Sequence, residues 1–372
     1  MSFLYVTIAA IAVVGLGLVL RYFGPRLKSP PIPIYGPPGP RPRELFVAEA
    51  GNNAISVYAI DGQGLLQSPA LRRIVDDPAQ PPLTRLVAPY DLFVDSTYAF
   101  VLNNVTNPEG DVIPDLDAIV IFGSDKNGAV SPDFSWFQVA FSSTIFSCIT
   151  VTRAPDSLLL SVNGPDPLVM QLDKFPLQPD DHGQAGTLVN SAFGIISGIA
   201  ASESSFYVVT QPAPGNQPST QPTAPQQEPM LLFFESSPRF MEMGEVAATR
   251  RIAGPNTLLS RPQRVTVDRN GFVYVTNWGD GEFSGSVTVY DPMADGNVLP
   301  VRRIGGPDAV RTRLGRPLGI AVSDDGFIFV ADTDVIKVFQ PDDDGDVAPH
   351  QVLEVGDGSN LTGLAFHVPS VN

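Results

Sequence analysis

The stretch that decides the fold reads Arg250-Arg-Ile-Ala-Gly-Pro255, Pro262-Gln-Arg-Val-Thr-Val-Asp268, Gly271-Phe-Val-Tyr-Val-Thr-Asn277 and Ser286-Val-Thr-Val-Tyr290. About 50 residues later the same four segments return as Arg302-Arg-Ile-Gly-Gly-Pro307, Pro317-Leu-Gly-Ile-Ala-Val322, Gly326-Phe-Ile-Phe-Val-Ala-Asp332 and Val335-Ile-Lys-Val-Phe339. Short alternating or β-branched segments bounded by Gly, Pro, Asn and Asp predict strands and turns. Four strands repeated at an interval of about 40 to 50 residues predict one blade of a β-propeller.

Weaker copies carry the repeat toward the N-terminus, with first strands expected at Pro89 to Asp95, Cys148 to Thr152 and Gly194 to Ala201. A blade that starts at residue 43 would begin with its second strand, Glu44 to Glu49. The segment Leu361 to Val368 has the character of the missing first strand. Pairing of this chain end with the first blade would close the ring and remove exposed sheet edges. The sequence therefore predicts an all-β, six-bladed propeller over residues 43–372.

The segments G-F-V-Y-V-T-N, S-V-T-V-Y and R-R-I-x-G-P resemble those of the NHL and YVTN families of β-propellers, particularly bacterial proteins with YVAN and SVTVY repeats. The resemblance is clear over residues 245–372, fair over 43–141 and poor over 142–244. It supports the propeller fold. It implies little about function, because such propellers serve as binding platforms, scaffolds and sometimes enzymes.

An uncharged apolar run, Phe3 to Leu20, precedes the repeats. A helix of this length reaches roughly 27 Å, close to the thickness of a bilayer core. A signal peptide would need a positively charged start and a cleavage site, which are not evident here. We therefore expect residues 1–28 to form a single membrane helix with a basic flank. Because Arg21, Arg26 and Lys28 follow the run, the propeller is placed on the cytoplasmic side, with a periplasmic location as the alternative.

Small residues at Ala9, Ala12 and Gly15 would let this helix pack closely against other membrane helices. Residues 29–42 form a proline-rich linker, which favours a semi-rigid extended spacer or a strip that docks on a partner. A second polar, proline-rich segment at 211–229 interrupts the fourth blade. We expect it to be a flexible surface insertion, with an arm that reaches a neighbouring subunit as the alternative.

Composition excludes several classes of function. The chain has 39 acidic and 23 basic residues and a net charge of −16, so nucleic acid would be repelled. Its one cysteine, Cys148, can form no disulfide within the chain and lacks partners for a thiol zinc site. The histidines are His182, His350 and His367, and no nucleophile elbow, phosphate loop or dinucleotide fingerprint accompanies them. The sequence predicts a protein that is not an enzyme.

The second strands end in polar residues that could converge near one mouth of the central channel. The candidates are Glu49, Asn103, Asn277 and Asp332. Their oxygens could bind a divalent cation, which is the one cofactor considered, and this resembles in kind the metal site of six-bladed lactonase propellers. The alternative is that each polar side chain caps its strand or hydrogen-bonds the adjacent turn.

An anchor, a stiff linker and a propeller without a catalytic signature together favour a scaffold. We expect a non-catalytic accessory subunit of a larger membrane protein complex, of respiratory or photosynthetic type, with the lipid bilayer and other membrane subunits as partners. One alternative is a metal-dependent, lactonase-like hydrolase that uses the polar ring. Another is an envelope propeller that binds a ligand.

Overall fold

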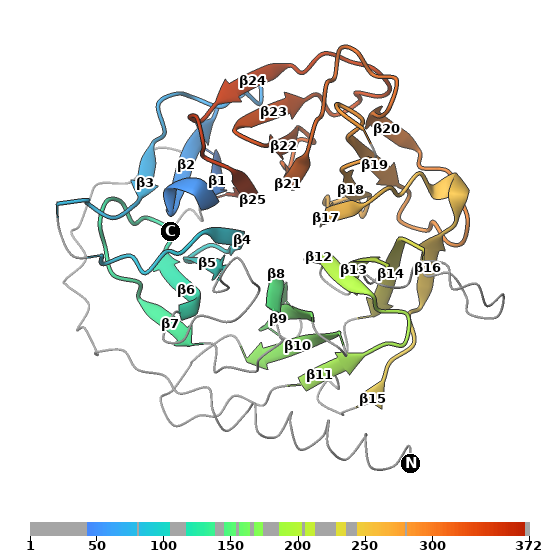
Figure 1. The fold of residues 1–372 in the computed structure, drawn as a ribbon, viewed down its shortest axis with the longest axis horizontal. Helices are drawn as coiled ribbons and strands as arrows, with labels where there is room; N and C mark the ends of the chain where they lie inside the picture. The colour runs from blue at the N-terminus through green and yellow to red at the C-terminus, as the bar shows by residue number, and fades with distance from the viewer. Residues whose placement is uncertain are drawn as a thin grey trace.

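The computed structural model describes residues 43–79, 82–104, 117–137, 145–153, 156–163, 167–173, 186–202, 205–212, 228–235, 244–279 and 281–368. Within these ranges the strands form six sheets, which follow one another around a central axis (Figure 1). The predicted all-β, six-bladed propeller is confirmed. The predicted membrane helix, with Ala9, Ala12 and Gly15, and the linker lie outside the described residues. Among the ranges given, no helix is long and apolar enough to cross a bilayer.

The first blade joins the two ends of the described chain. Its strand order is β25-β1-β2-β3, where β25 is Leu361–His367, β1 is Arg43–Glu49, β2 is Ala54–Ile60 and β3 is Arg72–Ile74. β25 pairs antiparallel with β1, and Glu44 lies opposite His367. The predicted closure of the first blade by the chain end is therefore confirmed. A short 3-10 helix, η1 (Ala50–Asn52), follows β1.

Each of the other blades is built on four antiparallel strands, with the first strand innermost. The second blade contains β4 (Pro89–Val94), β5 (Tyr98–Asn103), β6 (Asp117–Gly123) and β7 (Phe134–Phe137). The third contains β8 (Ile145–Arg153), β9 (Asp156–Asn163), β10 (Leu168–Asp173) and β11 (Gly186–Val189). The fourth contains β12 (Ile195–Ala201), β13 (Ser205–Gln211), β14 (Met230–Glu235) and β16 (Arg250–Ala253). The short β15 (Gly244–Glu245) leaves the fourth blade and pairs parallel with β11, which gives the third blade a fifth strand.

The fifth and sixth blades are the two most regular in sequence. They contain β17 (Pro262–Val267), β18 (Val273–Asn277), β19 (Ser286–Tyr290) and β20 (Arg302–Gly305), then β21 (Pro317–Val322), β22 (Ile328–Asp332), β23 (Val335–Phe339) and β24 (Gln351–Glu354). A second 3-10 helix, η2 (Pro255–Thr257), precedes the fifth blade. We call the face at which the inner strands begin the upper face, and the face at which they end the lower face.

The core lies between neighbouring blades. Leu45 of β1, for example, packs in one cluster with Phe329 of β22, and Phe46 packs in another with Val101 of β5. β18 and β22 are buried at every position. A strand that is covered on both faces buries both sets of alternating side chains, which explains why these second strands read as unbroken apolar runs.

A repeated contact at the rim joins successive blades. In three outer strands the second arginine of the Arg-Arg-Ile motif donates its backbone N–H to an Asn or Asp side chain in the next blade, over 2.8–3.0 Å, and accepts from the following glycine over 2.7–2.8 Å. We call these contacts rim latches. They join Arg73 to Asn127 and Gly128, Arg251 to Asp295 and Gly296, and Arg303 to Asp344 and Gly345. The three glycines have φ between 73° and 76°, a left-handed conformation that favours glycine.

Candidate functional site

Every inner strand is interrupted at the same place. The pairing register of each with its neighbour shifts by a β-bulge or similar irregularity near its third or fourth residue. One residue per blade occupies this place, and we call the set the inner ring: Asp91, Cys148, Gly198, Arg264, Gly319 and Gly363. Bulges bend a strand and redirect its side chains, so the channel at the inner ring has a different shape from one lined by regular strands.

The three glycines of the inner ring allow neighbouring strands to approach closely. A Cβ atom on Gly363 would lie 3.0 Å from the Cα of Asp91, and one on Gly198 would lie 3.0 Å from the Cα of Arg264. A Cβ on Gly319 would lie 3.0 Å from the backbone nitrogen of Leu364. These distances are tighter than ordinary contacts, so a side chain there would push two blades apart. The side chains of the inner ring therefore come from the other three positions.

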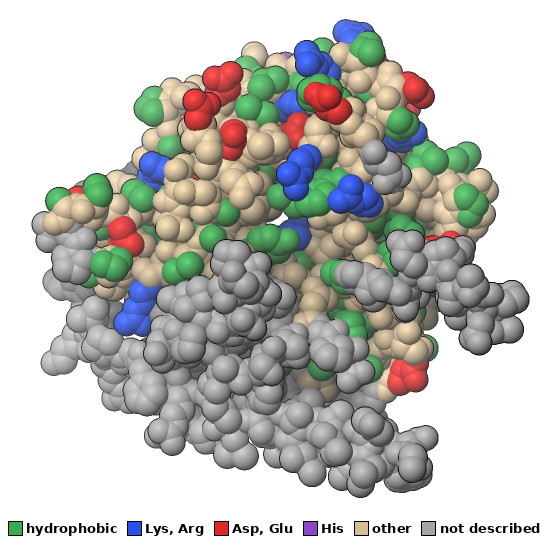
Figure 2. All heavy atoms as spheres, in the orientation of Figure 1, with side chains coloured by type: hydrophobic (Ala, Val, Ile, Leu, Met, Phe, Trp, Pro, Cys, Tyr) green, Lys and Arg blue, Asp and Glu red, His purple; other side chains and the backbone are tan. Residues whose placement is uncertain are grey.

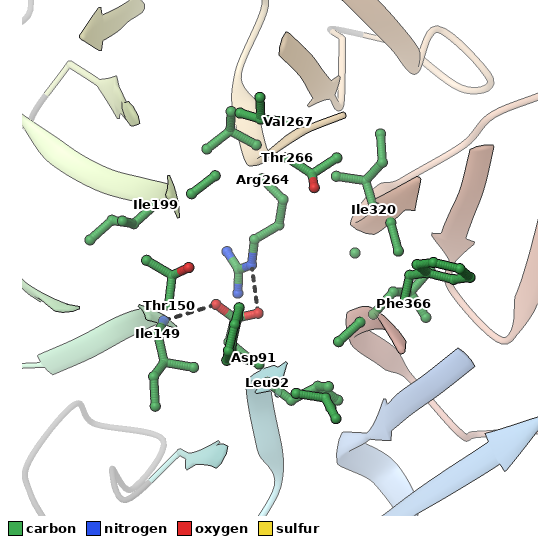
Figure 3. A pocket seen from close by; sticks show the side chains of 18 of the residues that line it. Asp91, Leu92, Ile149, Thr150, Ile199, Arg264, Thr266, Val267, Ile320 and Phe366 are labelled. Atoms are coloured by element: carbon green, nitrogen blue, oxygen red, sulfur yellow. Dashed lines mark hydrogen bonds and ion pairs between the residues drawn. The ribbon is translucent and has the colours of Figure 1, made fainter. Parts of the chain in front are cut away.

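Arg264 extends across the channel to the opposite blade (Figure 3). Its Nε lies 3.6 Å from Oδ1 of Asp91, and the second and fifth blades face each other in a ring of six. Its Nη1 donates to the carbonyl of Ser197 over 2.6 Å, and its Nη2 donates to the carbonyl of Tyr90 over 3.2 Å. The guanidinium also lies over the Tyr90 ring, 4.8 Å from its centroid. One side chain thus connects the second, fourth and fifth blades.

Burial and neighbouring groups shift the pKa values of the three inner-ring side chains. Asp91 is 7% exposed, and burial raises the pKa of its carboxyl although Arg264 and the N–H of Ile149 oppose the shift. Burial alone would lower the pKa of Arg264, but Cys148 and Asp91 raise it above its ordinary value. Burial also raises the pKa of the Cys148 thiol to about 11, so the thiol is protonated at neutral pH and is a weak nucleophile.

A cavity of about 290 Å³ extends from the inner ring toward the lower ends of the inner strands. All six inner strands contribute to its wall. The side chains of Ile199, Ile320 and Phe366 lie around the centre, and two hydroxyls come from Thr150 and Thr266 (Figure 3). The greater part of the exposed wall is nevertheless polar. A ligand that entered this cavity would meet polar groups as well as aliphatic side chains, with Asp91 and Arg264 at the end nearest the inner ring.

The four predicted site residues lie at the ends of second strands, as expected, and two of them fix loops of the fifth and sixth blades. The Oδ1 of Asn277 accepts from the N–H of Ser260 over 3.0 Å. The carboxylate of Asp332 accepts from the backbone N–H groups of Gly315 and Arg316 and from Nζ of Lys337, the last over 2.7 Å. Both side chains are buried, so these bonds satisfy groups that water does not reach.

The other two act similarly in the first and second blades. Asn103 accepts from the N–H of Val87 and donates to the carbonyl of Arg85, in the loop before β4. Glu49 is 1% exposed and accepts from Asn52, Ser56 and Arg73, with 2.6 Å between Oε2 and Nη2 of Arg73. These bonds are those of the alternative interpretation, in which the polar strand ends cap loops.

The metal hypothesis for Glu49, Asn103, Asn277 and Asp332 stays a prediction. Within the described part of the chain, no three His, Cys, Asp or Glu side chains lie together as a metal site. The oxygens of these four residues accept bonds from backbone and side-chain donors of their own blades, so a cation would have to replace donors already in place.

Two histidines are in the described ranges, and neither is among the residues that line the cavity. His367 is buried in β25, with its ring edge-on to Phe46 at 5.7 Å between centroids. His350 lies near Phe327, at 6.0 Å between ring centroids, and its Nδ1 is 3.2 Å from the side-chain nitrogen of Gln340. His182 lies outside the described residues.

The sequence interpretation missed the inner ring. Its signal becomes visible only when the six first strands are aligned, because the ring position is then Asp, Cys, Arg or Gly in front of an aliphatic residue. The six segments are Tyr90-Asp-Leu92, Ser147-Cys-Ile149, Ser197-Gly-Ile199, Gln263-Arg-Val265, Leu318-Gly-Ile320 and Thr362-Gly-Leu364. Asp or Arg at a position where the other blades have Gly or Cys indicates that the charged side chain has a specific structural or functional role.

Comparison with known proteins supports the fold. A family model described as a beta-propeller repeat matches residues 249–284, which include β16 to β18. The chain contains a β-propeller repeat. The search of curated proteins gave no significant match.

Solved structures with similar folds include a protein of unknown function from Bacteroides caccae, at 9% identity and a TM-score of 0.51, covering 88% of this chain and 99% of that chain. The periplasmic gluconolactonase of Pseudomonas aeruginosa aligns at 15% identity and a TM-score of 0.48, with the same coverage of 88% and 99%. Raptor of Chaetomium thermophilum aligns at 14% identity and a TM-score of 0.47, over 89% of this chain and 26% of that one. At these identities the likeness concerns the propeller alone.

Proposed function

We propose that this chain is a non-catalytic propeller that serves as a scaffold or accessory subunit of a larger membrane protein complex. The observation that carries the proposal is the use of the polar groups at the centre of the disk. Arg264 connects three blades across the channel, and Asn277 and Asp332 hold loops on the upper face. These polar side chains connect blades and hold loops in place, as a rigid platform for partner proteins requires.

The contacts of Arg43, which follows the predicted linker, are compatible with the membrane part of this proposal. Arg43 is the first described residue, and its guanidinium contacts Asp324 at 3.3 Å, pairs with Asp325, and donates to the carbonyl of Asp61 over 2.6 Å. These partners lie on the lower face of the sixth and first blades. A proline-rich linker that leaves from a fixed arginine would hold the propeller in a defined orientation above an anchor formed by residues 3–20.

Mild-detergent extraction of native membranes, followed by size separation and mass spectrometry, tests the proposal. We expect the chain to migrate with a defined large complex at fixed stoichiometry. A variant that lacks residues 1–28 controls for the contribution of the anchor and should dissociate or bind more weakly. Migration of the intact chain as a free monomer would contradict the scaffold role. A stoichiometric divalent ion that is lost in Asp332→Asn would favour the hydrolase alternative.

A further inference from the structure

Three exposed arginines gather around two aromatic rings on the upper face. The guanidinium carbons of Arg261 and Arg316 lie 5.2 and 4.7 Å from the centroid of the same ring, that of Trp278. The guanidinium of Arg313 lies 4.8 Å from the centroid of Phe283. We call these five residues the arginine–aromatic cluster. Its members come from the fifth and sixth blades, so the cluster bridges a blade boundary.

The loops that carry these side chains have an uncommon backbone conformation. Arg261, Phe283 and Arg313 have φ of 49°, 55° and 47°, a left-handed conformation that is uncommon for residues other than glycine. Such conformations cost on the order of 1 kcal/mol each and persist only where the surroundings impose them. Here the surroundings include Asn277, which binds the residue before Arg261, and Asp332, which binds the backbone of Arg316. The arginines are therefore held in position before any ligand arrives.

The charge of the cluster is uncompensated within the described part of the chain. The guanidiniums of Arg261, Arg313 and Arg316 form no ion pair with the described carboxylates. The nearby carboxylate of Asp332 forms an ion pair with Lys337 instead. The indole N–H of Trp278 is buried without a hydrogen-bond partner among the described residues. Unpaired arginines are unexpected in a chain of net charge −16, where carboxylates are plentiful.

Stacking on an aromatic ring leaves the edge of a guanidinium available. The plane lies along the ring, and the N–H groups at its edge can form two parallel bonds to one carboxylate. Basic side chains are visible beside the central opening over the blades of β17 and β21 (Figure 2). Phe283 is 36% exposed and offers an apolar contact next to these charges.

We propose that the arginine–aromatic cluster binds the carboxylates of an acidic segment of a partner protein. This inference rests on the proposed scaffold function and names the chemistry of the partner. A nucleic acid would be repelled by the charge of the chain as a whole, whereas a short acidic segment meets only the local field. Arg43 lies on the lower face, so the described chain enters the propeller on the face opposite the cluster.

Trp278 supplies the readout. The chain has two tryptophans, so Trp136→Phe leaves Trp278 as the single tryptophan. Full-length protein in mild detergent is titrated with a short synthetic peptide of alternating Glu and Leu. We expect a saturable change in Trp278 emission that weakens as salt is added. Arg261→Gln/Arg316→Gln should lower the affinity roughly tenfold or more, because two charge-assisted pairs are lost.

Two controls separate charge recognition from nonspecific binding. Arg269→Gln removes an exposed arginine of the lower face, between β17 and β18, and should leave the affinity unchanged. The peptide with Gln in place of Glu should not bind. Equal binding by the double variant and Arg269→Gln, or by the two peptides, would overturn the proposal. Binding of the cluster to phosphatidylserine vesicles and not to the acidic peptide would replace it with a membrane contact.

The outcome is separable from that of the proposed function. If the double variant binds the peptide normally and still migrates with the native complex, the cluster has no role in recognition and the scaffold function stands. If the wild-type chain migrates alone but binds the acidic peptide through these arginines, the scaffold function fails and the acidic-peptide site remains.

Discussion

At the scale of single residues, the channel is organised by one buried ion pair. Arg264 and Asp91 are 5% and 7% exposed, and they come from opposite blades. A buried pair contributes little net stability, because desolvation offsets the attraction between the charges. Removing one partner is costly because the other charge stays buried. The pair therefore constrains which blades can face each other more than it adds free energy of unfolding.

This account predicts a non-additive double-mutant cycle. Asp91→Leu and Arg264→Leu should each lower the free energy of unfolding by about 3–5 kcal/mol, because each leaves the other charge buried without its partner. Asp91→Leu/Arg264→Leu should lose much less than the sum of these two values, because no buried charge remains. Urea unfolding of the wild-type protein and the three variants provides the measurement. Additive losses in the double variant would show that the two side chains act independently.

A second residue-scale prediction concerns pH. The pKa of Cys148 in the folded protein is about 11 against an ordinary 9.0, so the folded state resists ionisation of the thiol. Its contribution to stability is complete below pH 9 and is lost as the pH rises toward 11, by about 2–3 kcal/mol in total.

Cys148→Ala should remove this part of the alkaline loss, whatever its effect on stability at neutral pH. Urea unfolding of both proteins below pH 9 and near pH 11 compares the two slopes. A variant that loses as much stability as wild type over this interval would exclude Cys148 as the source. Other residues that titrate at high pH contribute equally to both proteins and cancel in the comparison.

At the scale of elements, the rim latches connect three of the outer strands, β3, β16 and β20, to a turn of the next blade. Asp295→Ala removes the acceptor for the N–H of Arg251 and should lower the free energy of unfolding by about 1 kcal/mol. Asp308→Ala, at an exposed position outside the latches, serves as the matched control and should change stability by less than about 0.5 kcal/mol. Thermal or urea unfolding gives both values. Identical stabilities for the two variants would mean that the latch adds nothing.

The elements also show how far sequence reasoning reaches. The strand at Gly271 to Asn277 is predictable because its β-branched run ends at a turn, and β18 occupies Val273–Asn277. β15 is not predictable, since two residues carry no periodicity and the strand forms only where β11 offers an edge. The polar ends of the second strands are visible in the repeat, but only the structure shows that Asn277 and Asp332 hold loops. The inner ring depends on contacts between blades that are distant in sequence.

At the scale of the whole molecule, β25 holds the ring closed. Leu361 and Leu364 are buried between the first and sixth blades. Deletion of residues 361–372 should cost at least about 3–6 kcal/mol from these two leucines alone, in addition to the lost β25 ladder. We expect the truncated chain to lose cooperative unfolding and to aggregate, as seen by calorimetry and size exclusion. Deletion of residues 369–372 alone is the control; a truncation at 360 that melts like this control would contradict the closure argument.

Closure by the chain end also sets the order of events on the ribosome. β1 is the first of the described strands in chain order, whereas its partner β25 is the last of them and emerges only after the strands of the other five blades. At roughly 5 to 20 residues per second, one edge of β1 waits unpaired for on the order of tens of seconds. An unpaired edge invites pairing with other chains. The edge of β1 therefore has to be protected during this interval. Closely spaced ribosomes bring the unpaired β1 edges of several nascent chains together, so aggregation is most readily started there.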